Sequence, residues 1–346
     1  MAFDIFLMGD LTGSYHDMIA QVCRAEQLDF HRVWLGERHL ANGDLLWPSP
    51  MVAASFLAAK TQRIRIGLAA RILPFHHPLQ VAADALTLDV LTRGRFDLGL
   101  TRSSMDGQSH AAFGVSHDEA RRCFDEHYEV LRLACLGEPF SFKGRYFDLD
   151  SVVPNPLPIQ RPHPPIYLVA NSPASLDWAA DRGLPIFANG ALDLAATARV
   201  VSRYRTRATA AGFSPVDSDL LLNRFVFVAA SNAAAHRTMR EPFLRFLAHR
   251  APDLRAYLVR TFGPDGLDYD FLTREICIFG DPDHCASRFA ESRYRTGARH
   301  FLCTLNFITL DHERCVESME YFAADVMPRL STFFTRAIPP SIALEA

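Results

Sequence analysis

The stretch IRIGLAARILPFHHPLQVAADALTLDVLTRGRFDLGLTRSS, residues 64–104, decides the fold. Apolar residues alternate over 64–68 as in a buried strand, and Pro78 suits the first turn of the helix that follows. Apolar residues recur at helical spacing over 81–91, and a glycine ends this helix before a second strand over 95–100. Two strands joined by one helix predict a right-handed parallel βαβ unit, in which ligands bind at the C-terminal ends of the strands.

The same alternation of strand and helix runs through the rest of the chain. Strands are predicted at 3–8, 32–35, 64–68, 95–100, 166–170, 185–188, 221–229 and 299–304. Helices are predicted at 14–28, 50–60, 78–92, 116–136, 173–182, 192–211, 233–259 with a break near Pro252, 281–295 and 311–330. About eight strands in alternation with helices predict a closed (β/α)8 TIM barrel. An open doubly wound sheet is the second possibility, but no G-x-G-x-x-G motif follows any strand.

Three stretches depart from this alternation. FSFKGRYFDLD predicts a short hairpin around Lys143-Gly144, and the proline-rich run 154–165 predicts an extended crossing segment. Residues 260–275 are expected to be irregular, and a short apolar run follows at 276–279. We therefore expect one barrel domain with insertions over residues 1–334 and a flexible tail over 335–346.

Composition restricts the class of protein. The chain has 346 residues, of which 49% are hydrophobic and 22% charged, with a net charge of −3 and a pI near 6.5. No basic run suggests a nucleic-acid surface, and no stretch of about 18 apolar residues suggests a membrane span. The seven cysteines are scattered without a CxxC pair, so buried thiols are expected. A cytoplasmic protein is the expectation.

Titratable side chains follow two of the predicted strands. Glu37, Arg38 and His39 end one of them, either as a salt-bridged rim cluster or as a base and substrate clamp. His76 and His77 lie in the loop after another strand. Neighbouring loop histidines point apart, and no third ligand at chelating spacing is evident, so no metal is expected.

A second group of polar residues suits a phosphate. Arg102 ends the strand over 95–100 and offers either a planar donor fork for an anion or a partner for a carboxylate. Asn171, Ser172 and Ser175 lie at the start of the next helix, where backbone N–H groups bind anions, although plain capping by Ser172 explains them equally well. The three tryptophans are interpreted as packing residues.

The chain resembles the bacterial luciferase-like flavin-dependent monooxygenases from about residue 3 to residue 325. The matching stretches are VWLGERHL (33–40), RIRIGLAARILPFHHPLQVAADALTLDVLTRGRFDLGLTR (63–102), PNPLPIQRPHPPIYLVANS (154–172), SLDWAADRGLP (175–185) and FGDPDHCASRFAESRYRTGARHFL (279–302). The resemblance implies a barrel that binds reduced FMN at the C-terminal ends of its strands, with a separate flavin reductase supplying the FMNH2.

The resemblance also assigns residues to the cofactor. Arg102, Ser172 and Ser175 match the phosphate-binding positions, with Ala170 and Asn171 beside them; Ala69-Ala70 matches a non-proline cis peptide under the flavin ring, and Thr101 matches a reactive cysteine. Two positions depart from the family pattern. Arg38 replaces the first histidine of the Glu-His-His motif, and because arginine is no base, light emission by that route is not expected. Ser103 and Ser104 follow Arg102 where a glycine is frequent.

The implied activity is a monooxygenation. Reduced FMN and O2 would form a C4a-(hydro)peroxyflavin that hydroxylates a small organic substrate or inserts oxygen into it, and Glu-Arg-His occurs in relatives tied to natural-product biosynthesis. Arg38 would anchor an anionic group and His39 would move a proton. The alternatives are an oxidoreductase that uses F420 and a non-catalytic flavin-binding subunit. The family often dimerises through helices that correspond to 50–60 and 78–92, so a homodimer is expected.

Overall fold

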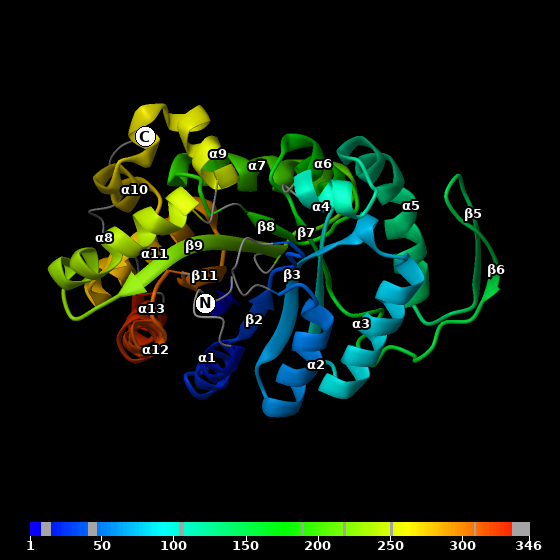
Figure 1. The fold of residues 1–346 in the computed structure, drawn as a ribbon, viewed down its shortest axis with the longest axis horizontal. Coiled ribbons are helices and arrows are strands. Elements are labelled where there is room, and N and C mark those ends of the chain that lie inside the picture. Colours follow the sequence, from blue (N-terminus) through cyan, green and yellow to red (C-terminus); the bar gives the residue numbers. More distant parts are fainter. Residues whose placement is uncertain are drawn as a thin grey trace.

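The computed structural model describes residues 1–7, 15–40, 47–103, 107–188, 190–216, 219–249, 252–307 and 309–333. Eight parallel strands form a closed ring (Figure 1). In ring order they are β1 (Ala2–Leu7), β2 (Arg32–Leu35), β3 (Arg65–Ile72), β4 (Phe96–Thr101), β7 (Ile166–Val169), β8 (Ile186–Ala188), β9 (Leu220–Val228) and β11 (His300–Asn306). The ring closes because β11 pairs with β1 and β8 pairs with β9. The predicted (β/α)8 barrel is confirmed.

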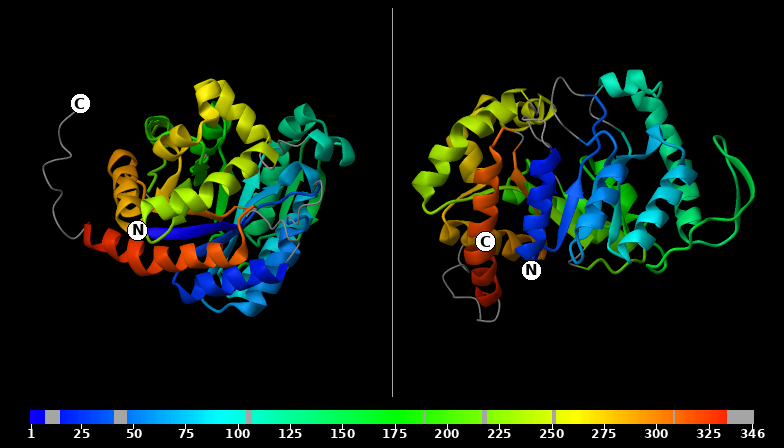
Figure 2. Two further views of the ribbon diagram at one scale, coloured as in Figure 1. Left: turned by 60° about the vertical axis from the view of Figure 1, so that its left-hand side comes forward. Right: turned by 60° about the horizontal axis from the view of Figure 1, so that its bottom comes forward.

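Helices surround the ring (Figure 2). They are α1 (Tyr15–Gln27), α2 (Pro50–Lys60), α3 (Pro78–Thr92), α4 (Gly107–Ala112), α5 (His117–Cys135), α6 (Pro173–Ala180), α7 (Leu194–Ala210), α8 (Asn232–His249), α9 (Pro252–Phe262), α10 (Tyr269–Glu275), α11 (Pro282–Thr296), α12 (His312–Tyr321) and α13 (Met327–Phe333). Many begin at a side-chain cap: Asp193 accepts from the Ala196 N–H, and Asp281 from that of His284. No helix in the described part of the chain is long and apolar enough to cross a bilayer.

Two strand pairings lie outside the ring. The predicted hairpin is present as antiparallel β5 (Phe140–Lys143) and β6 (Asp148–Val152), which project from the right of Figure 1. Strand β10 (Ile278–Gly280) pairs with the last residues of β9, at Val226–Val228. Because the earlier residues of β9 pair with β8 and β11, β9 is shared between the barrel and this extra strand.

The expectation of an irregular stretch at 260–275 is wrong. Part of it continues α9, and the rest forms the 3-10 turn Pro264–Leu267 and helix α10, which begins at the Asp268 cap. The break predicted near Pro252 in the helical stretch 233–259 is confirmed, because α8 ends at His249 and α9 begins at Pro252. A π-helical turn (Phe322–Val326) separates α12 from α13. The expected tail at 335–346 lies outside the described residues.

Apolar side chains fill the barrel and the layer around it. Trp34, Tyr167, Phe187, Leu221 and Leu302 form a cluster inside the ring. A Cβ at Gly67 would meet the Trp34 ring at 2.2 Å, so β3 needs glycine there. A separate, largely aromatic core lies between β9, β10 and helices α8 to α10; its buried aromatic members include Phe225, Phe227, Phe243, Phe246, Phe279 and Phe307.

Buried charges are paired at the N-terminal ends of the first strands. Arg65 donates two hydrogen bonds to Asp97, from Nε at 2.9 Å and from Nη2 at 2.8 Å. Nε of Arg32 lies 3.2 Å from the same carboxylate and 3.7 Å from Asp4, and both carboxylates have side chains that are 0% exposed. Asp4 also accepts from Nε1 of Trp34. These contacts join the four strands β1, β2, β3 and β4 at the N-terminal end of the barrel, which in TIM barrels contributes to stability and not to catalysis.

Candidate active site at the strand ends

The predicted site residues gather at the C-terminal end of the barrel. Arg38 and His39 follow β2, and Ala69-Ala70 lies in β3; Thr101 ends β4 and Arg102 follows it; Ala170, Asn171 and Ser172 follow β7, and Ser175 lies in the first turn of α6. Because all eight strands are parallel, these positions share one rim.

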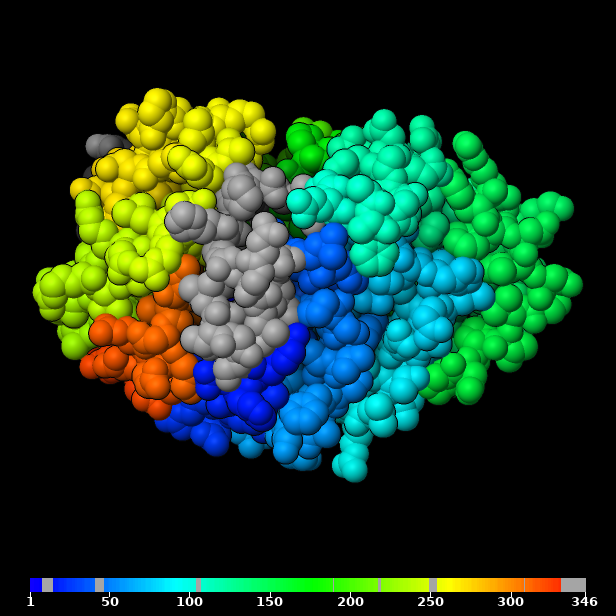
Figure 3. All heavy atoms as spheres, viewed as in Figure 1, coloured from blue at the N-terminus to red at the C-terminus, as the bar shows by residue number. Residues whose placement is uncertain are grey.

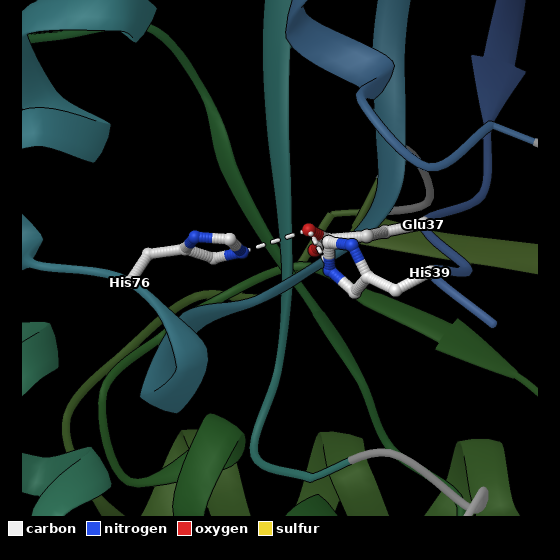
Figure 4. Close-up of side chains that lie close together, drawn as sticks. All are labelled: Glu37, His39 and His76. Atoms are coloured by element: carbon white, nitrogen blue, oxygen red, sulfur yellow. Dashed lines mark hydrogen bonds and ion pairs between the residues drawn. The ribbon is translucent and has the colours of Figure 1, made fainter. Parts of the chain in front are cut away.

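Glu37 is the centre of a buried cluster at this rim (Figure 4). Its Oε1 accepts from Nη1 of Arg71 at 2.7 Å, bonds Nε2 of His76 at 2.7 Å, and lies 2.8 Å from Nε2 of His39. Its Oε2 accepts from the backbone N–H of Ile72 at 2.5 Å. The Glu37 side chain is 0% exposed, whereas those of His39, Arg71 and His76 are between 11% and 16% exposed. Three elements, β2, β3 and the turn Leu73–Phe75, therefore meet at one carboxylate.

The environment holds Glu37 ionised. Burial alone would raise the pKa of this carboxyl group, but the contacts with His39 and His76 and the charge of Arg71 outweigh burial and lower the pKa to about 2. Burial lowers the pKa of Arg71, and Glu37 and Asp84 oppose that change. Glu37 is therefore a fixed negative charge beside two imidazoles.

Sequence reasoning did not bring these groups together. The carboxylate of Glu37 and the ring nitrogens of His39 and His76, which are potential metal ligands, lie within 4.8 Å of one another. The spacing of these residues along the sequence did not reveal that they are neighbours. Arg71 already supplies a cation to the same oxygen. As expected, the two loop histidines point apart: His77 caps α3, and its ring packs on Phe147. The sequence signal that could have revealed this cluster is Arg71, a charged residue that directly follows the apolar run of β3.

Arg38 lies away from that cluster. Its backbone N–H donates to the Trp47 carbonyl at 3.3 Å, and its side chain is exposed. Among the described residues, its guanidinium makes no ion pair. Arg38 is therefore a solvent-accessible cation at the rim, adjacent in sequence to the half-buried His39.

A second, cationic cluster lies where β4 and β7 end. The Arg102 guanidinium lies 5.5 Å from the Phe124 ring and 5.8 Å from the Trp178 ring, and that of Arg182 lies 4.0 Å from Trp178. The Nε of Arg102 is buried without a hydrogen-bond partner in the described structure. Burial lowers the pKa of Arg102 and Arg182 adds to this, although nearby Asp125 opposes it. This group has the charge and an orphaned donor suited to an anion.

Two serines begin the neighbouring helix. Ser172 caps α6, accepting from the Ser175 N–H at 3.2 Å and donating to the Ser175 hydroxyl at 3.0 Å. Ser172 is exposed and Ser175 is half-buried. The capping role that the sequence allowed for Ser172 is therefore present. The two hydroxyl groups lie at a helix N-terminus, where backbone N–H groups favour an anion.

Strand β3 carries the non-proline cis peptide that the resemblance predicts. The Ala69–Ala70 bond is cis, and the pairing of β3 with β4 shifts register between Leu68 and Arg71. The partner strand needs Gly99 there, because a Cβ at this position would lie 1.9 Å from the Leu68 carbonyl oxygen.

The residues after β4 make contacts that sequence reasoning missed. Thr101 donates from its hydroxyl to the Ser103 carbonyl at 3.1 Å. The Ser103 hydroxyl bonds Nε2 of His110 at 2.9 Å and Nδ1 of His117 at 3.1 Å. Residue Ser104 lies outside the described residues. Ser103 thus links β4 to α4 and α5 beside Arg102, at a position where a glycine could make no such link.

Known proteins are similar to this chain in sequence and in fold. The model of a family described as luciferase-like monooxygenase matches residues 1–300. The alkanal monooxygenase alpha chain of the Kryptophanaron alfredi symbiont is 25% identical over 331 residues, which cover 88% of this chain and 90% of that protein. Monooxygenase RslO1 from Streptomyces bottropensis superposes with a TM-score of 0.82 at 25% identity, covering 95% of this chain and 99% of its own. The oxygenating constituent of 3,6-diketocamphane monooxygenase from Pseudomonas putida, in complex with FMN, superposes with a TM-score of 0.81 at 20% identity, covering 98% and 99%.

Proposed function

Because the chain belongs to the luciferase-like monooxygenase family of flavin-dependent enzymes, we propose that it binds reduced FMN at the C-terminal rim of its barrel and oxygenates a small organic substrate with O2. The observation that carries this proposal is the orphaned, buried Nε of Arg102, which follows β4; Ser172 and Ser175 follow β7, the next strand in the ring. An ionised phosphate would satisfy that donor.

The residues present fit the flavin. Arg102, Ser172 and Ser175 would hold the phosphate, with Ala170 and Asn171 beside them, and Ala69-Ala70 and Thr101 would contact the ring. When bound, reduced FMN would supply two electrons to O2, so that one oxygen atom enters the substrate and the other leaves as water. The barrel rim would exclude water from this reaction.

The substrate is proposed to carry a negatively charged group. Arg38 supports this because it presents an exposed cation without an ion-pair partner in the described structure, one residue from His39. A half-buried imidazole next to a guanidinium suits an anionic substrate whose reacting group exchanges a proton. Hydroxylation and Baeyer–Villiger-type insertion both fit this arrangement, and a natural product is the proposed source of the substrate.

Two partners belong to the proposal. A separate flavin reductase would supply FMNH2, and the name of one structural relative, an oxygenating constituent, is consistent with a two-component system. A second copy of the chain would cover α2 and α3, which lie side by side on the surface in Figure 3. Their outer faces expose Val52 by 69%, Phe56 by 50% and Leu91 by 62%. A monomer by light scattering at micromolar concentration would contradict the dimer.

The compartment is part of the same proposal. The described residues include all seven cysteines, and none of them forms a disulfide. Burial raises the pKa of Cys123 to about 11 and that of Cys135 to about 12, so these two thiols are unreactive. Thiols in this state are typical of the reducing cytoplasm.

Anaerobic titration with FMNH2, followed by an O2 pulse, tests the function. We expect tight binding, and Arg102→Ala should raise the dissociation constant roughly 10- to 100-fold, the worth of a charge-assisted hydrogen bond. Arg203→Ala is the matched control, because Arg203 lies on the surface of α7 and pairs with Asp177 of α6. An equal loss of affinity for FMNH2 in both variants would overturn the proposal. Turnover of F420 without turnover of FMNH2 would also overturn it.

A further inference from the structure

The hydrogen bonds around His76 fix its tautomer. Nε2 of His76 lies 2.7 Å from Oε1 of Glu37, and its Nδ1 lies 3.2 Å from Nη2 of Arg71. A guanidinium only donates hydrogen bonds, and an ionised carboxylate only accepts them. His76 is therefore the neutral imidazole with its proton on Nε2, because this form alone satisfies both neighbours.

This arrangement keeps His76 out of proton transfer. Its only lone pair, on Nδ1, accepts from Arg71. A second proton at Nδ1 would face the Arg71 N–H, so that two donors would oppose each other and the hydrogen bond would be lost. His76 is therefore a fixed partner that, together with Arg71, holds the Glu37 carboxylate in place.

His39 differs from His76 in its contacts. Its buried Nε2 lies within ion-pair distance of Glu37 Oε1, at 2.8 Å, without the geometry of a hydrogen bond, and its Nδ1 has no hydrogen-bond partner among the described residues. Its ring packs against Phe113, with centroids 4.5 Å apart, and its side chain is 14% exposed. His39 thus has an available nitrogen on one side of the ring and a fixed negative charge on the other.

We propose that Glu37 is a positioning residue that makes His39 the proton-carrying imidazole of this site, while Arg71 and His76 hold Glu37 in place. The O–H bond of the reacting group breaks as an N–H bond forms at His39 Nδ1, and Glu37 compensates the charge of the resulting imidazolium. The inference rests on the proposed function for the reaction that supplies this proton.

The charged and titratable groups around His39 are few in the described structure. Glu37 contacts its Nε2, and the His76 ring lies 5.8 Å away between centroids. Arg71 lies behind both, paired with Glu37 and influenced by Asp84. The Phe113 ring packs on the His39 ring, and Arg38 precedes His39 with an exposed side chain, so Glu37 is the charged group that lies closest to a ring nitrogen of His39 among the described residues.

A matched pair of variants separates the two histidines. In His76→Gln, the amide can still donate to Glu37 and accept from Arg71, so kcat should stay within about tenfold of wild type, the worth of one altered hydrogen bond. In His39→Gln no base remains, and kcat should fall about 10²- to 10⁴-fold with little change in KM. Equal losses of kcat in the two variants would overturn the inference. Thermal melting monitored by circular dichroism checks that both variants fold.

The role of Glu37 has its own readout. In Glu37→Gln the negative charge beside His39 is lost, which favours the neutral imidazole, so the acidic limb of the pH–rate profile should move to lower pH. A merely structural role would lower kcat by the same factor at every pH. That second result would overturn the positioning role.

Nitrogen NMR of ¹⁵N-histidine-labelled protein tests the assignment without any flavin. His76 should show the Nε2–H tautomer at neutral pH; the Nδ1–H tautomer or a cation there would overturn the inference. ZnCl2 titration is a second test, because a zinc ion held between Glu37 and His76 would need the lone pair of the His76 nitrogen that faces Glu37, which is Nε2. Micromolar zinc binding that is lost in His76→Gln would also overturn it. A protein that fails to oxidise FMNH2 would refute the proposed function, whereas the tautomer of His76 decides this inference by itself.

Discussion

Replacing Asp97 by asparagine should destabilise the barrel from its N-terminal end. The substitution keeps the size of the side chain but removes the buried charge that pairs with Arg65 at 2.8 Å and with Arg32 at 3.2 Å. The buried Arg32 would then keep the longer ion pair with Asp4, at 3.7 Å, and its contacts with the Trp34 and Tyr167 rings. Breaking a buried ion pair from one side costs about 3 to 5 kcal/mol, and the retained amide oxygen favours the lower value.

The corresponding change in melting temperature follows from the size of the chain. Unfolding entropy is about 2.1 cal/mol/K per residue, which gives roughly 0.7 kcal/mol/K for 346 residues. A loss of about 3 kcal/mol should therefore lower Tm by about 4 °C, measured by circular dichroism. Asp148→Asn is the control, because Asp148 is 75% exposed and lies 3.8 Å from Lys143. A Tm of Asp97→Asn within about 1 °C of both other proteins would refute this reasoning.

Three further predictions concern single side chains. The contacts of Glu37 lower its pKa from 4.5 to about 2, so the ionised form should add about 3 kcal/mol to the free energy of unfolding above pH 4.5, and this contribution should disappear as the pH falls towards 2. Urea unfolding of Glu37→Gln should lack this pH-dependent contribution, and the same loss of stability in acid for wild type and variant would contradict the prediction. Gly99→Ala places a Cβ 1.9 Å from the Leu68 oxygen and should cost about 3 kcal/mol, whereas Gly107→Ala, with open space around it, should melt like wild type. Burial lowers the pKa of Arg224 to about 10, and no carboxylate lies within ion-pair distance in the described structure, so Arg224→Met should leave Tm unchanged or raise it; a fall of several degrees would argue against this.

Helices and strands whose ends are marked by nearby residues, such as a proline at the start of a helix, could be predicted from the sequence. Helix α2 begins at Pro50 and ends at Lys60 as expected, and β2 spans Arg32–Leu35 as expected. Helix α10 was missed because its seven residues depend on tertiary packing, with Tyr269 and Leu272 buried in the aromatic core. A helix this short is not stable by itself, so its sequence gives little periodic signal.

The candidate site residues could be placed at the C-terminal rim of the barrel, but the contacts between them could not be predicted. The order of strands and loops was enough to bring His39 and Arg102 to the C-terminal end. The bond between Glu37 and His76 joins residues 39 positions apart and depends on how β2 and β3 align, which no spacing rule specifies. Arg71 lies beyond the strand predicted over 64–68, because β3 extends to Ile72, so its role as counter-charge was missed.

The aromatic core beside β9 has a consequence for motion. Nearly all of its members come from one stretch of chain, Phe225 to Phe279, with Phe307 added from the segment after β11. A segment that encloses its own core can open as a local unit while the barrel strands stay hydrogen-bonded. We therefore expect amide hydrogens of α8 to α10 to exchange with solvent before those of β1 to β4. Such local opening would let the rim admit molecules of different shape without unfolding the barrel that holds it.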